Sequence, residues 1–300
     1  MMDMLHIQGL YKNFGEKAVL KGLDLTVPEH SIFGFIGKNG AGKTTTIKTV
    51  LGLLKADAGR ILVNGEEVIY GDSPTNRHIS YLPDVPAFYS FMTAEEYLQF
   101  CGRISGMDPA QIRSRCKELL LLVGLAEEKH RIKGFSRGMK QRLGIAQALL
   151  NRPKLLICDE PTSALDPVGR KEILDILLAA RQQTTVLFST HILSDVERIC
   201  TDVAFLNNGV VELQGTVADI KSKFRNDVYR LETGSDAARN QLLAAFPGME
   251  AAQDGSLQFR QQCHDVHAVL GFIAENRLPL TRMEQAEPTL ENLFMEVTGQ

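Results

Sequence analysis

The chain has 300 residues, a length typical of about two domains of roughly 150 residues each. Its hydrophobic fraction of 44% and its charged fraction of 23% are ordinary for a soluble globular protein, so the sequence can supply a core of useful size. The formal net charge of -3 argues against a nucleic acid as partner, since a broad nucleic-acid-binding surface needs a clear basic excess.

The sequence offers no candidate for a membrane span or a secretory signal. Apolar runs are short: none is longer than Leu119 to Val123, which lies beside Glu118 and is far shorter than the ~18 residues of a transmembrane helix. The N-terminal Met1-Met2-Asp3-Met4 lacks a positively charged start. The five cysteines are scattered and form no CxxC pair, which predicts reduced thiols in a cytosolic protein. If the protein works on a membrane, another chain must supply the membrane part.

The N-terminal stretch alternates apolar with polar residues and predicts strands, the last of which is a short apolar strand from Ser31 to Ile36. A glycine-rich turn follows, and then a helix from Lys43 to about Leu54. Further strands are expected at residues 60–63 and 68–70, with Asn64-Gly65 as the hairpin turn between them.

The sequence pattern predicts a helical insertion over about residues 88–150. Thr93 and Glu96 have the spacing of a capping box at a helix start, and Asp108-Pro109 is typical of a second helix start. The expected α/β pattern then resumes, with strands at 155–158 and 185–189. Helices are expected after each of them, at 168–180 and 194–200. Strands that alternate with helices indicate a parallel sheet.

The pattern changes around residues 221–227. From Val228 onward we expect a small α+β domain in which strands and two helices surround a core, followed by a final helix from Leu290. The predicted domains are therefore residues 1–222 and 223–300.

The most informative motif is a phosphate-binding loop. The glycines let the backbone turn so that N–H groups face phosphate oxygens, and the following helix directs its positive dipole end at them. Lys43 is expected to reach the terminal phosphates, and the Thr44 hydroxyl suits Mg²⁺. The motif G-x-x-x-x-G-K-[ST] is matched by Gly37-Lys38-Asn39-Gly40-Ala41-Gly42-Lys43-Thr44, and we include Thr45 in the predicted ATP-binding set.

Candidate catalytic groups follow two of the predicted strands. Asp159 and Glu160 end an apolar strand, where Asp159 can hold Mg²⁺ and Glu160 can orient or deprotonate an attacking water. His191 follows the next strand, at the edge of the sheet where ligands of α/β proteins gather. We expect it to contact the γ-phosphate.

With these motifs the chain resembles the ABC-type ATPases, and more narrowly the ATP-binding subunits of ABC-2-type exporters, over about residues 4–220. Phe14 matches the aromatic residue that stacks on adenine. The segment from Phe135 to Arg142 matches the signature motif, which contacts the ATP of a partner chain. The matching signature residues are Ser136, Arg137, Gly138 and Met139, and the dimer loop corresponds to Ser163, Ala164, Leu165 and Asp166.

The chain departs from the family pattern at two places. Arg137 and Met139 replace a glycine and a glutamine of the usual Leu-Ser-Gly-Gly-Gln signature. Asp84 stands where the family usually has a glutamine, so its expected contact with Mg²⁺ or the attacking water involves a shorter, charged side chain. The ending from Pro288 to Met295 resembles that of exporter subunits.

The resemblance implies the fold class, the cofactors and the partners. It implies a P-loop NTPase fold of the ABC-ATPase type, α/β, with an antiparallel β subdomain, a helical insertion and the small C-terminal α+β domain. ATP and Mg²⁺ are the implied cofactors. The implied activity is ATP hydrolysis that drives closure of a dimer, with itself or a similar ATPase subunit, and so powers integral membrane permease subunits from the cytoplasmic face of the membrane.

Three alternatives stay open in the sequence. The chain could be a soluble ABC ATPase that acts on ribosomes or DNA, or a binding module without turnover. The third concerns the aromatic segment Val85 to Phe91, where Phe88, Tyr89 and Phe91 could receive a helix of the membrane subunit or could cover the core of the insertion.

Overall fold

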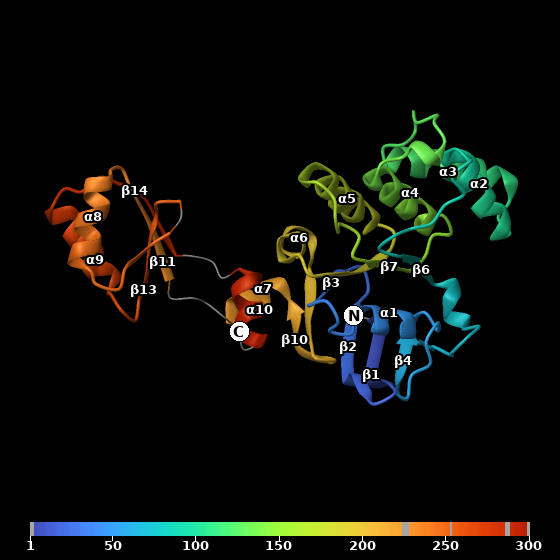
Figure 1. Cartoon of the computed structure of the whole chain (residues 1–300), viewed down its shortest axis with the longest axis horizontal. Coiled ribbons are helices and arrows are strands. Elements are labelled where there is room, and N and C mark those ends of the chain that lie inside the picture. Colours follow the sequence, from blue (N-terminus) through green and yellow to red (C-terminus); the bar gives the residue numbers. More distant parts are fainter. Residues whose placement is uncertain (1–2, 224–227, 253, 286–288, 299–300) are drawn as a thin grey trace. The chain divides into compact units, whose positions relative to one another are not determined.

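A computed structural model describes residues 3–223, 228–252, 254–285 and 289–298 of the chain (Figure 1). The chain forms two compact units, Met1–Ala218 together with Phe294–Gln300, and Asp219–Leu293. The expected boundary between residues 222 and 223 stays a prediction. Pro288, the first residue of the exporter-like ending, and Asp227 at the expected change of pattern lie outside the described residues.

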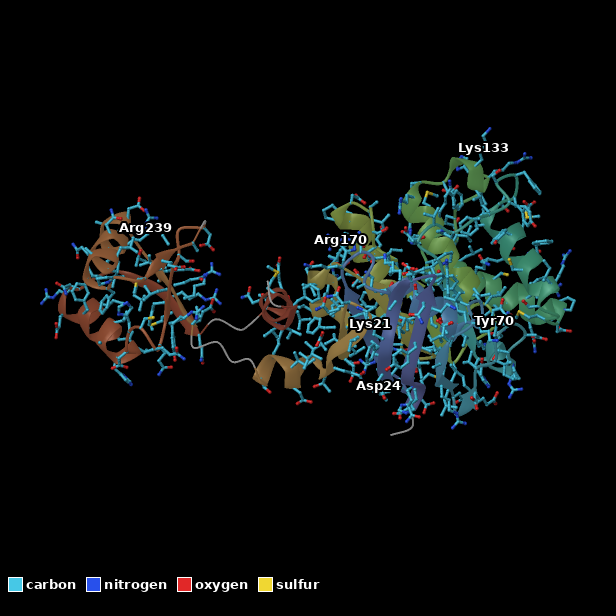
Figure 2. All side chains as sticks on the ribbon, turned by 60° about the horizontal axis from the view of Figure 1, so that its bottom comes forward. Lys21, Asp24, Tyr70, Lys133, Arg170 and Arg239 are labelled. Carbon is cyan, nitrogen blue, oxygen red and sulfur yellow. The ribbon has the colours of Figure 1, made fainter. Side chains whose placement is uncertain are left out.

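The first unit contains an antiparallel sheet in the order β2-β1-β4-β5. Its strands alternate buried apolar with exposed polar residues, and Lys21 and Asp24 on β2 extend outward from it (Figure 2). Asn64 and Gly65 form the predicted hairpin turn with positive φ angles of 51° and 77°. The strands are β1 (Asp3–Phe14), β2 (Lys17–Pro28), β4 (Ala58–Val63) and β5 (Glu66–Glu67).

The expected strand at residues 68–70 is wrong. The Val68 N–H still donates to the Ile61 carbonyl at 2.9 Å, but the Ile69 N–H turns to the Ser73 hydroxyl at 3.1 Å. A side chain therefore takes the backbone donor that would have continued the strand. Tyr70 is left exposed beyond the end of β5 (Figure 2).

A second sheet forms the centre of this unit, in the order β10-β9-β3-β8-β7-β6. All neighbouring pairs are parallel except β9 and β10, so five strands end at the same edge. The strands are β3 (Ile32–Gly37), β6 (Ile79–Leu82), β7 (Leu155–Asp159), β8 (Thr185–Thr190), β9 (Asp202–Asn207) and β10 (Val210–Thr216).

Helices cover the central sheet, and α2 to α5 gather beside its β6–β7 end (Figure 1). Thr93 forms the predicted capping box with Glu96 at the start of α2. The main core joins the antiparallel sheet, α1 and β3, through residues such as Leu5, Ile47 and Phe35. The helices are α1 (Lys43–Val50), α2 (Ala94–Ile104), α3 (Pro109–Leu122), α4 (Arg137–Leu149), α5 (Pro167–Ala180), α6 (Leu193–Ile199) and α7 (Val217–Lys223), with short 3₁₀ turns at Pro74–Arg77 and Ile132–Gly134.

Helix α1 ends earlier than expected. Gly52 has a φ of 69°, and the N–H groups of Leu53 and Leu54 both return to the Lys48 carbonyl, at 2.9 and 3.1 Å. This left-handed glycine turn stops the helix at Val50, four residues before the predicted end.

The second unit is a small α+β fold. Its antiparallel sheet has the order β12-β13-β11-β14, and the chain order β-α-β-β-α-β is the ferredoxin-like arrangement. Leu231, Leu242, Leu257 and Val269 are completely buried in its core. The elements are β11 (Val228–Thr233), α8 (Asp236–Ala245), β12 (Glu250–Ala251), β13 (Leu257–Arg260), α9 (Val266–Glu275) and β14 (Leu280–Gln285).

The last helix, α10 (Leu290–Thr298), brings the chain back to the first unit. The Phe294 ring packs against the buried Phe205 ring of β9, with 5.6 Å between the ring centroids. In the part of the chain that the structure describes, no helix is long and apolar enough to span a bilayer.

Candidate active site

The predicted phosphate loop connects β3 to α1. Gly42 has a φ of 117°, and an added Cβ would lie 2.8 Å from the Leu20 side chain, so glycine is required there. Gly37 is equally constrained, since a Cβ would lie 2.7 Å from the Leu206 carbonyl. Among the described residues no side chain caps the start of α1, so the N–H groups of its first turn remain available to an anion.

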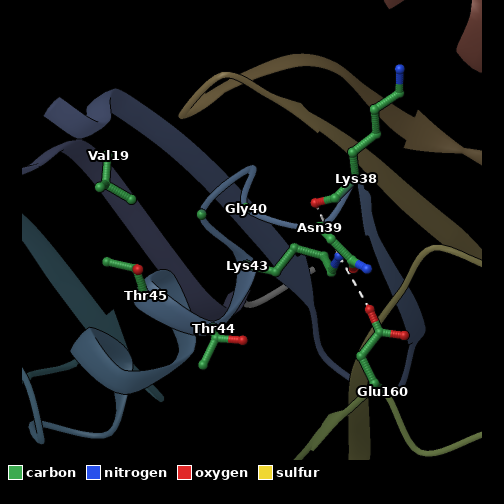
Figure 3. Close-up of a pocket in the computed structure, with 9 residues that line it drawn as sticks. Val19, Lys38, Asn39, Gly40, Lys43, Thr44, Thr45 and Glu160 are labelled. Atoms are coloured by element: carbon green, nitrogen blue, oxygen red, sulfur yellow. Dashed lines mark hydrogen bonds and ion pairs between the residues drawn. The ribbon is translucent and has the colours of Figure 1, made fainter. Parts of the chain in front are cut away.

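The loop encloses an open hollow of about 190 Å³. Figure 3 shows Lys43 pointing across it towards Glu160. Lys38, Asn39, Gly40, Gly42, Lys43, Thr44 and Thr45 of the predicted set line this hollow, together with Val19 and Glu160. Ala41 is not among the lining residues; its N–H closes the loop on the Lys38 carbonyl at 3.1 Å.

Lys43 is buried in the loop. Its Nζ donates to the Gly37 carbonyl at 2.5 Å and to the Lys38 carbonyl at 3.4 Å, and it lies 3.2 Å from Glu160 Oε1. The ammonium group is thus fixed beside the hollow, with one carboxylate as its counter-charge. Since an anionic phosphate would offer the same ammonium a further charge partner, this geometry suits the predicted role of Lys43.

Asp159 and Thr44, two of the predicted Mg²⁺ ligands, contact each other. Thr44 Oγ1 donates to Asp159 Oδ2 at 2.9 Å, and Ser189 Oγ donates to Asp159 Oδ1 at 2.5 Å. Asp159 is almost fully buried, so these two donors orient its carboxylate. Burial, followed by the charge and hydrogen bond of Asp159, raises the pKa of Tyr81 to about 12. The Tyr81 hydroxyl therefore stays protonated at neutral pH and can donate to the carboxylate.

Glu160 leaves the strand in a left-handed backbone conformation, with a φ of 49°. Its N–H donates to the Ser189 carbonyl at 3.0 Å, and this bond holds the turn on β8. Oε2 accepts from His191 Nδ1 at 2.9 Å, while Oε1 is buried beside Lys43 without a hydrogen-bond donor among the described residues. His191 therefore orients one carboxylate oxygen, and the other faces the Lys43 ammonium group at 3.2 Å.

The signature segment starts α4. Ser136 is its N-cap, and its hydroxyl accepts from the Met139 N–H at 3.2 Å. Space beside Gly138 is open, since the nearest atoms to an added Cβ lie 4.0 Å away. A second hollow of about 330 Å³ is lined by Ser136 to Met139 and by Ala164 to Asp166, among others.

Asp84 joins the two sides of this second hollow. Its Oδ1 accepts from Ser163 Oγ of the dimer loop at 2.6 Å and from an Arg137 nitrogen of the signature at 3.2 Å. The expected Mg²⁺ contact of Asp84 stays a prediction, and the contacts that the structure gives its carboxylate are to these two residues.

Phe14, expected to stack on adenine, and the signature segment, expected to contact the ATP of a partner chain, both lie outside the phosphate-loop hollow. Phe14 is half exposed and lies under Lys12 Nζ at 5.5 Å, and it is not among the residues that line the phosphate-loop hollow. The phosphate-loop hollow and the signature hollow have no lining residue in common.

Sequence reasoning missed three residues around the site, namely Ser189, Tyr81 and Val19. Ser189 was predicted as the end of a strand, but its role depends on the register that places it opposite Asp159. Tyr81 ends next to Asp159 because β6 pairs with β7. The signal for Ser189 was its position at the end of a predicted strand of the parallel sheet, whereas no strand was predicted at Tyr81.

Both units of the chain match known protein families. A family model for ABC transporters matches residues 20–163, and a model for the C-terminal domain of DrrA1-3-like ATP-binding proteins matches residues 215–298. In solved structures, an ATP-binding subunit of an ABC transporter has 34% identity and a TM-score of 0.65, covering 74% of this chain and 93% of its own. CbiO1 from Clostridium perfringens, part of the ABC transporter complex CbiONQ, has 26% identity and a TM-score of 0.68, covering 82% and 97%.

The similarity to known relatives extends over both units of the chain. The uncharacterized ABC transporter ATP-binding protein YxlF of Bacillus subtilis is 39% identical over 98% of this chain and 99% of its own length. The bacitracin transport ATP-binding protein BcrA of Bacillus licheniformis is 34% identical over 100% and 98%. The linearmycin resistance ATP-binding protein LnrL of Bacillus subtilis is 31% identical over 99% and 98%. With the phosphate loop, the carboxylate pair and the signature helix arranged as described, the chain belongs to the ATP-binding proteins of ABC transporters.

Proposed function

We propose that the chain hydrolyses ATP to ADP and phosphate and that this reaction powers export through separate membrane subunits. The observation that carries the proposal is Glu160, whose carboxylate lies between Lys43 and His191 at the edge of the phosphate-loop hollow. The loop and Lys43 would bind the phosphates, and Glu160 Oε1 would accept the proton of an attacking water. His191 would keep the carboxylate in place. Relatives named for bacitracin transport and linearmycin resistance favour an antibiotic-like cargo.

The donor set beside the loop fits Mg²⁺. Thr44 and Asp159 offer hydroxyl and carboxylate oxygens, the hard donors that Mg²⁺ takes when it is held by few protein ligands together with phosphates. The ion would supply neutralisation of phosphate charge. Asp159, oriented by Ser189, would be the principal protein ligand.

We propose that ATP is held between two chains. The signature and phosphate-loop hollows of one chain share no lining residue among those described, although both segments are expected to contact ATP. A second copy, or a similar ATPase subunit, would place its signature segment over the phosphate loop of the first. The Ser136 hydroxyl and the start of α4 would then face the γ-phosphate.

The proposed contact with the membrane subunits lies in the aromatic segment after Asp84. Phe88 is half-buried and packs edge-on against Tyr97, at 5.1 Å between ring centroids. Tyr89 and Phe91 are 52% and 61% exposed, so part of the segment serves the core and part faces outward. We propose that these exposed rings receive a helix of a membrane permease subunit at the cytoplasmic face of the membrane.

A soluble ATPase acting on ribosomes or DNA is not supported. The relatives reported above are ATP-binding proteins named for an ABC transporter, for bacitracin transport and for linearmycin resistance, and their similarity continues through the second unit. A binding module without turnover would have no use for the Glu160–His191 pair, and the hydrolysis experiment below separates the two cases.

The Glu160→Gln variant tests the hydrolysis. It should bind ATP and lose about 10²-fold or more of its turnover, because an amide cannot accept the proton. Lys43→Ala should lose nucleotide affinity as well, since it removes a charge partner of the phosphates. ATPase rates and nucleotide binding are measured on both. Glu212→Gln on the exposed side of β10 is the control, and full activity in Glu160→Gln would refute the assignment.

Ser189→Ala tests the metal site. Loss of a hydrogen bond to a carboxylate typically costs about 1.5–3 kcal/mol, so we expect the Mg²⁺ concentration for half-maximal ATPase activity to rise by roughly tenfold or more. Ser194→Ala, which loses a 3.3 Å bond from Arg170, is the control. An unchanged Mg²⁺ dependence in Ser189→Ala would show that the bond does not orient a metal ligand.

Mixing two inactive variants tests the composite site. Lys43→Ala lacks a working phosphate loop, and Ser136→Arg blocks the signature. A mixed dimer has one site built from the intact phosphate loop of one chain and the intact signature of the other. The mixture should recover ATPase activity that neither variant has alone. Activity no greater than the sum of the two would contradict a site shared between chains.

Substitutions in the aromatic segment test the membrane contact. Tyr89→Ala with Phe91→Ala should lower co-purification with the membrane subunits that accompany the wild-type chain, while basal ATPase activity and stability persist. Phe88→Ala is the comparison, because loss of its packing on Tyr97 should lower stability. If the double variant loses stability and basal activity too, the exposed rings belong to the fold and the contact lies elsewhere.

A further inference from the structure

The two departures from the family pattern contact each other. Asp84, which follows β6, and Arg137, the first residue of α4, are 53 positions apart in sequence, yet an Arg137 terminal nitrogen lies 3.2 Å from Asp84 Oδ1. Ser163 closes the group, since its hydroxyl lies 2.6 Å from the same carboxylate oxygen and 3.3 Å from the same Arg137 nitrogen. We call Asp84, Arg137 and Ser163 the acid–arginine cluster.

The backbone around this cluster is fixed while its charged side chains are not enclosed. Gln141 on α4 donates to the Asp84 carbonyl at 3.2 Å and holds the loop after β6 against the helix. The side chains of Arg137 and Asp84 are 46% and 47% exposed. The ion pair can therefore break without unpacking the core.

Arg137 also borders the hollow in which the signature segment would meet nucleotide. It directly follows the N-cap Ser136 and lines the hollow of about 330 Å³ together with Gly138 and the dimer loop. A guanidinium group binds phosphate oxygens well. In the single chain described here, its charge is paired with Asp84 instead.

We propose that Arg137 exchanges partners when two chains close over ATP: it leaves Asp84 and binds a phosphate of the nucleotide held by the opposite chain. Asp84 is then a positioning residue that restrains the signature segment and the dimer loop until nucleotide competes for the arginine. This proposal rests on the composite site proposed above and adds Arg137 to it as a residue that binds a phosphate of the nucleotide.

The exchange has a measurable consequence for dimer closure. The Asp84 carboxylate competes with the nucleotide for Arg137, so removing its charge should ease closure. Exposed ion pairs contribute little, about 0.2–1 kcal/mol, so a change of about 1.4- to 5-fold is the expected scale. The effect should diminish in high salt, because screening weakens exposed pairs.

The test uses the full chain carrying Glu160→Gln, in which ATP binds without turnover. The ATP concentration for half-maximal dimer formation is measured by analytical ultracentrifugation. Asp84→Asn should lower that concentration about 1.4- to 5-fold, and Arg137→Gln should raise it. With Arg137→Gln already present, adding Asp84→Asn should change nothing. Arg137→Lys, which keeps the positive charge, should retain a response to Asp84→Asn.

A matched control is the pair of Arg198 and Asp175, 2.9 Å apart and 40% and 51% exposed. Asp175→Asn should leave the ATP requirement unchanged. The exchange would be overturned if Asp84→Asn had no effect on the ATP requirement, or if its effect were the same with and without Arg137→Gln. An equal effect accompanied by a shifted Mg²⁺ requirement would instead indicate that Asp84 contacts the metal ion. If Glu160→Gln forms no dimer at any ATP concentration, the composite site itself fails, and the exchange fails with it.

Discussion

The parallel pairing of β3, β7 and β8 is the constraint on which the site depends. Parallel strands end at one edge, and the register places Asp159 opposite Ser189 at that edge, next to the β3 end from which the phosphate loop starts. A shift of one residue would turn Asp159 to the other face of the sheet, away from Thr44. Such a shift would also break the hydrogen bonds that Thr44 and Ser189 donate to the buried Asp159 carboxylate.

The charges of the site are arranged in pairs that nucleotide can compete for. Lys43 and Glu160 neutralise each other at 3.2 Å inside the protein, where an unpaired charge is costly. Binding of phosphate would give Lys43 a second anionic partner. Glu160 would then interact mainly with His191 and with water. The same logic applies to Arg137 and Asp84 near the surface, where the weaker pair is easier to separate.

The motif-bearing parts of the site could be predicted from sequence because their chemistry is local. The loop from Gly37 to Thr44 carries its own turn residues, and the apolar strand before Asp159 predicts its burial. The roles of Ser189 and Tyr81 could not be predicted in this way, because they depend on strand register. The contact of Asp84 with Ser163 was likewise hidden, since it joins positions 79 residues apart. In the fold, α1 and the strand after Gly65 differ from expectation because one glycine turn and one serine hydroxyl redirect backbone donors.

The return of Phe294 to Phe205 makes the first unit discontinuous in sequence. The chain leaves this unit at Ala218, builds the whole ferredoxin-like unit, and comes back with its last residues. During synthesis residues 219–293 must therefore leave the ribosome before Phe294 can cover the Phe205 side of the central sheet. The smaller unit can complete its own core first, so the nucleotide-binding unit is completed only after the smaller unit has been synthesised.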